Sequence, residues 1–224
     1  MRPYDPQRTT VSITNVLAIS GSLRARSTNT EVLRAAALVA PPSVRVTLFV
    51  GLDRLPHFNP DLDTEAAIPL APVHELRSQV DAADGLLICS PEYAHGVPGA
   101  LKNALDWLVS GPEILYQPIG LLNASPHSTH ARDSLAETLR TMSTLLVPRA
   151  SLDLPLAGRR LEAAAIAAEP VLAQLLRESL AALVAEVATS RQMRAAVRRP
   201  VERTCGMTAC PVLPVQALRK SGGA

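Results

Sequence analysis

The chain has 224 residues, of which 47% are hydrophobic and 19% are charged, and its formal net charge is +2. This composition is typical of a globular protein with a sizeable core and excludes a disordered chain. The small net charge gives no long-range field that would favour nucleic acid or an anionic membrane surface as a partner. The three cysteines, Cys89, Cys205 and Cys210, lack the number and spacing of a disulfide framework, which indicates a reducing compartment.

The first fifteen residues contain Pro3, Asp5 and Pro6 but no apolar segment of the kind found in a signal peptide. No uncharged apolar run reaches the roughly 18 residues of a membrane-spanning helix. We therefore expect a cytoplasmic protein that has no membrane partner and whose residues 1–15 form an N-terminal extension.

A short apolar run at residues 16–19 predicts a first buried strand, and Val32, Leu33 and Ala36 predict a helix after it. The loop between them, residues 20–29, is dense in small hydroxyl and amide side chains. A loop from a strand into a helix directs backbone N–H groups and the positive end of the helix dipole at one spot, which favours an anion. Arg24 adds a planar donor fork suited to phosphate. The alternative is an ordinary turn whose serines cap the helix.

Two common phosphate-binding loops are excluded at this position. The segment does not read Gly-x-Gly-x-x-Gly, which disfavours a dinucleotide-binding fold of that type. It also lacks the Gly-Lys-Ser/Thr of an NTPase loop.

A β-branched run at residues 44–50 predicts a second strand. The proline-containing segment that follows holds Asp53, Asp61 and Asp63, which suggest either a divalent-metal site or a surface loop. We favour the surface loop, because prolines separate the acids and no calcium-loop Glu or Gly completes the set. An amphipathic helix is expected over residues 72–83.

The central stretch of the chain is residues 85–108. Its first part, 85–89, is apolar throughout and predicts a fully buried strand. Four loop-forming residues follow, Pro91, Gly96, Pro98 and Gly99, so the next helix begins only after them. Ligands of open α/β sheets collect beyond the carboxyl ends of the strands, which makes this loop a candidate binding site.

A fourth strand is expected at residues 119–123, a helix through Leu135 and Leu139, a fifth strand at 147–154 and a long helix at 169–187. His127 and His130, in the loop after the fourth strand, suggest a metal site or a polar loop, and we favour the loop because no Cys or acid stands at ligand spacing.

Residues 191–224 contain five closely spaced arginines followed by a Pro-, Gly- and Cys-containing segment. The alternatives are a nucleic-acid contact and a solvated helix end with a loose tail. We favour the second, because no aromatic residue lies among the arginines. Five buried strands that alternate with helices predict an α/β fold, a doubly wound five-stranded parallel sheet with helices on both faces, spanning residues 16–190.

Two strings resemble the NADPH-dependent FMN reductase family. Residues 91–107 resemble its flavin-contacting Pro-Glu-Tyr-Asn loop and the Pro-Gly-x-Leu-Lys-Asn-x-x-Asp-Trp helix start, with Ala94 in place of the Asn. Residues 21–29 resemble its phosphate loop, Gly-Ser-x-Arg-x-x-Ser-x-Asn. The resemblance covers about residues 16–155 and implies a flavodoxin-like fold, noncovalently bound FMN, and NADPH or NADH as co-substrate.

The resemblance also implies the cofactor-binding residues. The FMN phosphate would lie among the residues of the first loop, Ser22, Leu23, Arg24, Ser27, Thr28 and Asn29. The isoalloxazine ring would lie against the loop Pro91, Glu92, Tyr93, Ala94 and His95, with Ser125 on a third side. Because hydride passes from the nicotinamide to flavin N5, no catalytic side chain and no metal is expected.

The implied activity is electron transfer from NAD(P)H through FMN to a quinone, free flavin, azo compound or oxyanion. The alternatives are a flavodoxin-type electron carrier and a flavin-free binding or regulatory protein on the same fold. The resemblance implies a homodimer or homotetramer built near Asp106 to Leu108, so Trp107 is interpreted either as an interface residue or as a core residue. His95 is interpreted either as a solvent-facing residue or as one that tunes the flavin and its acceptor, since histidine titrates near working pH.

Overall fold

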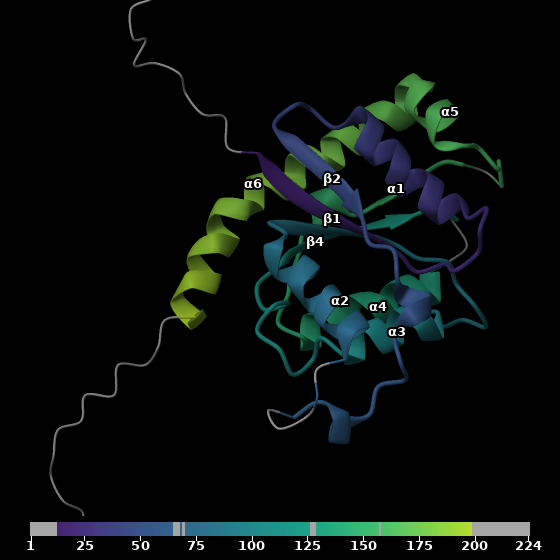
Figure 1. Cartoon of the computed structure of the whole chain (residues 1–224). Helices are drawn as coiled ribbons and strands as arrows, with labels where there is room; N and C mark the ends of the chain where they lie inside the picture. Colours follow the sequence, from purple (N-terminus) through teal and green to yellow (C-terminus); the bar gives the residue numbers. More distant parts are fainter. Residues whose placement is uncertain (1–12, 65–67, 69, 126–128, 157, 199–224) are drawn as a thin grey trace, which may run out of the picture.

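The computed structural model describes residues 13–64, 68, 70–125, 129–156 and 158–198, and in it a parallel sheet lies between two layers of helices (Figure 1). The six strands are β1 (Thr14–Ser20), β2 (Val44–Leu48), β3 (Gly85–Cys89), β4 (Pro118–Asn123), β5 (Leu145–Leu146) and β6 (Leu152–Asp153). Their order is β2-β1-β3-β4-β5, and β6 also pairs with β4; every pairing is parallel. This is the flavodoxin-like strand order, which confirms the predicted fold class.

The helices cover both faces of the sheet (Figure 1). One layer consists of α1 (Thr28–Val39), α5 (Ala163–Ala168) and α6 (Pro170–Arg198), and the other of α2 (Ala71–Ala82), α3 (Gly99–Asp106) and α4 (Thr129–Thr141). Short 3₁₀ turns are η1 (Leu52–Arg54), η2 (Pro60–Leu62) and η3 (Pro148–Ala150). Because both faces are covered, every residue of β3 and β4 is buried, which explains why these strands are apolar without alternation.

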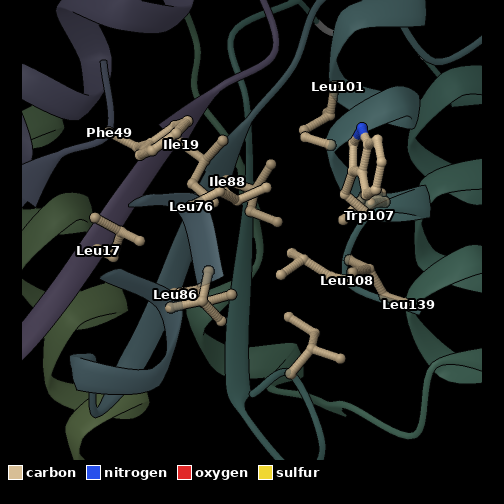
Figure 2. Close-up of a cluster of buried hydrophobic side chains, with 14 of the residues drawn as sticks. Leu17, Ile19, Phe49, Leu76, Leu86, Ile88, Leu101, Trp107, Leu108 and Leu139 are labelled. Carbon is tan, nitrogen blue, oxygen red and sulfur yellow. The ribbon is translucent and has the colours of Figure 1, made fainter. Parts of the chain in front are cut away.

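The core between the sheet and the α2–α3–α4 layer contains Trp107 (Figure 2). Its side chain is only 1% exposed, its Nε1 donates to the Pro56 carbonyl at 2.9 Å, and its ring meets Phe58 edge-to-face at 5.1 Å. Asn103 fixes the same segment, because its amide donates to the Pro56 carbonyl and accepts from the Phe58 N–H. Trp107 is therefore a core residue of the fold, the second of the two interpretations of its position.

The predicted fifth strand, residues 147–154, is wrong in detail. The fifth position of the sheet is filled by two short strands, β5 and β6, with η3 between them. Pro148 has no N–H to donate and begins this turn, which interrupts the ladder. The hydroxyl of Ser151 replaces a backbone acceptor by taking the Leu121 N–H at 3.0 Å. The sheet thus has six strands instead of five.

The last helix is longer than predicted. Instead of residues 169–187, α6 covers Pro170–Arg198, and a short helix, α5, precedes it. Ser190 and Arg194 hold its second half against the sheet side, since the Ser190 hydroxyl donates to the Tyr116 carbonyl and Arg194 donates to the Ala83 carbonyl. Of the helices that the structure describes, α6 included, none combines the length and apolar character needed to cross a bilayer.

Candidate functional site

Three loops meet at one edge of the sheet. The parallel register pairs Ser20 of β1 with Cys89 of β3, and Cys89 with Leu122 of β4, so these strands end side by side. The first two loops touch directly, because a side chain at Gly21 would place its Cβ 2.5 Å from the Ser90 hydroxyl. The chain leaves β1 and β3 toward opposite faces of the sheet, which makes this edge the topological switch point where ligands bind.

The loop between β1 and α1 contains a buried hydroxyl that has no partner. Ser27 stands at the N-cap of α1, is 3% exposed, and makes no side-chain capping bond to the helix. Its Oγ has no hydrogen-bond partner among the described residues. An unpaired buried donor costs free energy that a ligand oxygen would recover. Because the first N–H groups of a helix also lack intrahelical partners, an anion at this helix end would satisfy both.

Ser27 lines a cleft of about 570 Å³ that carries an excess of positive charge. The charged residues around it are Arg24, Arg26, Glu31, Arg34, Arg160 and Glu162. Arg34 pairs with Glu31 at 2.5 Å, whereas the exposed Arg24 and Arg26 make no side-chain hydrogen bond or ion pair within the described part of the chain. The cleft is therefore suited to a phosphate group.

Arg160 in this cleft lies far along the sequence from the loop that it faces. The Glu31 carboxylate connects the two segments, because its second oxygen accepts the Ala163 N–H at 2.9 Å at the start of α5. This bond holds the segment that contains Arg160 next to the first loop. The sequence interpretation missed Arg26, Arg34 and Arg160. Arg26 could have been found from the sequence, because it lies two residues after Arg24 in the same loop. No local pattern connects Arg160 with that loop.

Two of the predicted phosphate residues take part in internal bonds. The Asn29 side-chain oxygen accepts from the Cys89 thiol at 3.2 Å. Burial raises the pKa of that thiol, so the sulfur keeps its proton and remains a donor. Ser22 accepts the Arg24 N–H at 3.3 Å, which shapes the loop. Thr28 lines the cleft, while Leu23 is 57% exposed at the loop surface.

The loop after β3 closes in a tight two-residue turn. Tyr93 and Gly96 exchange both of their backbone hydrogen bonds, at 3.1 and 2.9 Å. The two residues between them, Ala94 and His95, have φ values of 49° and 61°. Positive φ at both central positions defines a type I′ turn, in which Asn and Gly are preferred. Ala94 therefore occupies a left-handed conformation that its side chain disfavours.

Glu92 connects this turn to α4. Its carboxylate is 11% exposed; one oxygen accepts the Ala131 N–H at 2.9 Å, and the other lies 3.0 Å from His95 Nδ1. The His95 ring in turn meets the His130 ring edge-to-face at 4.5 Å. The Ala131 N–H, together with the two histidines, lowers the pKa of Glu92 from its usual value, so this carboxyl group is ionised at neutral pH.

The third loop carries Ser125, whose N–H donates to the Asn123 side chain at 3.1 Å. The Asn123 amide donates to the Asp153 carboxylate, and Asp153 also forms an ion pair with Arg132 of α4. Residues 126–128, including His127, lie outside the described residues. Within the described residues, no group of three or more His, Cys, Asp and Glu side chains is placed to hold a metal ion.

The three loops therefore combine an anion cleft with exposed aliphatic and aromatic surface. Leu23 and Tyr93, one on each of the first two loops, are 57% and 56% exposed. A phosphate group at one end and a flat, partly apolar group at the other would match this arrangement. The structure brings the predicted residues to the same edge on three neighbouring strand ends, with Pro91 and Glu92 half-buried and the turn residues exposed.

Comparison with known proteins gives similar sequences and similar folds. A quinone reductase of Escherichia coli strain K12 is 35% identical over 129 residues, which are 54% of this chain and 68% of that protein. An NAD(P)H-dependent FMN reductase of Pseudomonas aeruginosa is 38% identical over 112 residues, 49% of this chain and 59% of that protein. Among solved structures, the FerB flavoenzyme NAD(P)H:(acceptor) oxidoreductase of Paracoccus denitrificans has a TM-score of 0.64 at 25% identity, covering 80% of this chain and 99% of that one.

The family comparison covers the whole sheet as far as the end of β6. The model of the NADPH-dependent FMN reductase family matches residues 14–157, which contain all three loops of the site. The match agrees with the two sequence strings and with the strand order, and on these grounds the chain belongs to the NADPH-dependent FMN reductase family.

Proposed function

We propose that this protein is an FMN-dependent oxidoreductase that takes electrons from NADPH or NADH and passes them to quinone-type acceptors. Membership of the family supports the cofactor and the nicotinamide co-substrate. The quinone acceptor rests on the similarity to proteins named quinone reductase. The assay below, repeated with a free flavin, an azo compound or an oxyanion in place of the quinone, tests the other acceptor classes.

The observation that carries the proposal is the unpaired hydroxyl of Ser27. A buried Ser Oγ without a partner, at the N-terminus of a helix and in an arginine-lined cleft, fits a phosphate oxygen. The FMN phosphate supplies that oxygen. Of the residues proposed to hold the phosphate, Arg24, Ser27 and Thr28 line the cleft, together with Arg26. From the same loop, Ser22, Asn29 and the backbone of Leu23 would complete the set of donors.

The isoalloxazine ring is assigned to the neighbouring loop edges. Pro91, Glu92, Tyr93, Ala94 and His95 border this position on the β3 side, and Ser125 borders it on the β4 side. Tyr93 and Leu23 offer exposed apolar surface to a flat ring. Because the turn is fixed by the Tyr93–Gly96 hydrogen bonds and by Glu92, the ring meets a preformed edge.

When bound, FMN supplies the hydride chemistry, taking a hydride from the nicotinamide and delivering it to the acceptor. The chain's part is to hold the phosphate through Ser27 and Arg24 and to keep one face of the ring site open. The exposed Tyr93 and His95 stand at that open side, where nicotinamide and acceptor would enter in turn. The buried thiol of Cys89 keeps its proton, because burial raises its pKa.

The test begins with the absorption spectrum of the purified protein. A flavin spectrum, or binding of added FMN at micromolar concentration or tighter, is expected. Anaerobic addition of NADPH or NADH should bleach the flavin band, and 1,4-benzoquinone should restore it. A protein that binds FMN but is not bleached by either nicotinamide would be an electron carrier, and one that binds no flavin would be a binding protein on this fold.

We further propose that the protein is a cytoplasmic homodimer or homotetramer. Leu62 and Ile68, 45% and 86% exposed, line a cleft of about 390 Å³ beside α2 that also reaches Trp107, near the predicted interface. Aliphatic side chains exposed in this way are typical of a surface that another subunit covers. Light scattering at tens of micromolar tests the assembly, and a monomer would contradict it.

The proposed domain organisation is an N-terminal extension at residues 1–15, one FMN-binding domain at 16–190, and a basic tail at 191–224. The site loops and strands β2 to β6 lie within these bounds, but β1 begins earlier, at Thr14. The helix α6 continues to Arg198, so a variant truncated after residue 190 would lose the Arg194 bonds to the Ala83 carbonyl. Limited proteolysis with mass spectrometry tests where the compact domain ends.

A further inference from the structure

We propose that His95, positioned by Glu92, donates a proton to the acceptor as the acceptor is reduced. This inference rests on the proposed function and assigns an acid to the same site. The sequence interpretation assigned no catalytic side chain, because hydride transfer from nicotinamide to flavin requires none. The second half of the reaction is different, since a quinone needs a proton as well as a hydride.

The balance of the reaction identifies the missing component. Conversion of a quinone to a hydroquinone adds two electrons and two protons. A hydride carries both electrons and one proton, so one more proton must reach the second oxygen. In the proposed step the Nε2–H bond of the His95 imidazolium breaks and an O–H bond forms on the quinone. The neutral ring then takes a proton back from water.

The geometry of Glu92 and His95 is that of an oriented acid. An ionised carboxylate only accepts hydrogen bonds, so the 3.0 Å contact requires a proton on His95 Nδ1. That contact leaves Nε2 as the ring nitrogen that can face a ligand. Glu92 cannot rotate away, because its other oxygen holds the Ala131 N–H at the start of α4. A base or acid fixed by a third group is the arrangement that proton-transfer catalysis needs.

The backbone presents the His95 imidazole at the open side of the proposed isoalloxazine site. His95 has φ of 61° and its side chain is 77% exposed, so the turn presents the imidazole outward instead of packing it. A left-handed conformation at two consecutive non-glycine residues stores strain, and such strain is concentrated at functional positions. The turn follows β3 directly and therefore stands beside the strand ends where the ligand is expected.

Charged and titratable groups face the His95 ring from its own loop and from α4. Glu92 faces His95 from its own loop, and His130 faces it from α4. Tyr93 is the titratable neighbour within the turn, and Arg132, the next charged residue on α4, is engaged by Asp153. Among these groups, the Glu92 carboxylate is the one that contacts a nitrogen of the His95 ring, at 3.0 Å.

The test compares two acceptors that differ in their need for a proton. The FMN-loaded protein is reduced with dithionite and mixed with 1,4-benzoquinone or with ferricyanide, which accepts electrons without a proton. In His95→Gln, the ratio of the benzoquinone rate to the ferricyanide rate should fall by about tenfold or more. A positioned acid typically raises the rate of a proton-transfer step by about 10²- to 10⁴-fold. A change in flavin potential moves both rates and leaves the ratio unchanged.

A matched control is His74→Gln on α2. His74 pairs only with Ser78 of its own helix among the contacts that the structure describes, at 3.5 Å, and should leave the rate ratio unchanged. A ratio that changes by less than tenfold in His95→Gln would contradict the proposal. So would an equal fall in the control.

A second measurement follows the positioning role of Glu92 without any turnover. In ¹⁵N-labelled protein, the nitrogen chemical shifts of neutral His95 should show the proton on Nδ1. In Glu92→Gln the amide oxygen can retain the Ala131 N–H while its NH₂ group faces the ring, so the proton should move to Nε2. A wild-type ring protonated on Nε2 in its neutral form would overturn the proposal.

The outcomes separate this inference from the proposed function. Dithionite supplies the electrons, so a protein that binds FMN but ignores NADPH and NADH would contradict the function while the acceptor comparison still decides the role of His95. A wild-type protein that takes up no FMN would contradict both.

Discussion

Replacing Ser27 with alanine should stabilise the flavin-free protein and weaken its binding of FMN. The Ser27 hydroxyl is 3% exposed and has no partner among the described residues, so the flavin-free protein carries the cost of burying it. An unsatisfied buried polar group costs about 1–3 kcal/mol. An N-cap serine normally offsets this by bonding the helix, but Ser27 makes no such bond, and the usual loss on removing a cap does not arise.

The two effects have opposite signs and measurable sizes. Removing the hydroxyl should raise the free energy of unfolding of the flavin-free protein by about 1 kcal/mol, the lower end of that range. For a domain of this size that raises Tm by about 2–4 °C. Loss of a hydrogen bond to a charged phosphate should cost about 1.5–3 kcal/mol, which is roughly a 10- to 150-fold increase in the Kd for FMN. Binding of riboflavin, which has no phosphate, should not change.

Ser179→Ala is the matched control. Ser179 is also fully buried, but its hydroxyl donates to the Ala150 carbonyl at 2.7 Å, and it does not line the arginine-rich cleft. Its removal should lower the stability of the flavin-free protein by about 1 kcal/mol and leave the Kd for FMN unchanged. Thermal unfolding of both flavin-free variants and titration with FMN and riboflavin provide the comparison. A Ser27→Ala protein that melts below wild type, or binds FMN equally well, would refute the reasoning.

Four further outcomes are expected. Arg24→Ala should weaken FMN by about 1.5–3 kcal/mol with little effect on riboflavin, and equal losses for both ligands would remove Arg24 from the phosphate site. Ala94→Asn should raise the free energy of unfolding by about 0.5–1 kcal/mol in denaturant melts, because Asn tolerates the left-handed turn. Glu92→Gln should lower the free energy of unfolding at neutral pH, because folding lowers the pKa of Glu92. The wild-type advantage is complete above the ordinary pKa of about 4.5 and disappears as the pH falls through the folded-state pKa. Melts of the two proteins that differ equally at all pH values would argue against this. Steady-state kinetics should give parallel double-reciprocal lines, because donor and acceptor use one open side in turn; intersecting lines would mean that both bind together.

The sequence predicted the sheet well because its central strands are buried on both faces. Residues 85–89 are apolar throughout and form β3 without any irregularity. The fifth position was harder, because Pro148 lies inside an apolar run, and only the hydroxyl of Ser151 shows how β4 is completed. The length of α6 was predicted wrongly because its last residues are charged. Arg191 and Arg194 suggested a solvated end, yet their stems and charges reach Asp84 and the Ala83 carbonyl across the fold.

The sequence predicts which loops form the candidate site, but it does not predict the contacts that their side chains make. Ser27 and Arg24 follow a strand and precede a helix, which is enough to expect an anion there. That Ser27 lacks a partner follows only from the packing of the finished loop. Arg160 joins the cleft because Glu31 captures the Ala163 N–H, a contact between residues too far apart in sequence for any pattern to reveal. Glu92 was expected beside the flavin, but its bond to Ala131 depends on where α4 packs.

The strained positions of the chain differ in what holds them. Tyr116 and Ser143 also have positive φ, but they stabilise each other, because the Tyr116 N–H donates to the Ser143 carbonyl at 2.9 Å and Ser190 donates to the Tyr116 carbonyl. Their strain is offset inside the fold. Ala94 and His95 are exposed and are held by the turn, by Glu92 and by the ring contact with His130, so less of the surrounding structure offsets their strain. A ligand that contacts this turn and the Ser27 hydroxyl would offset both costs at once, which supports the proposal that this edge of the sheet binds the cofactor.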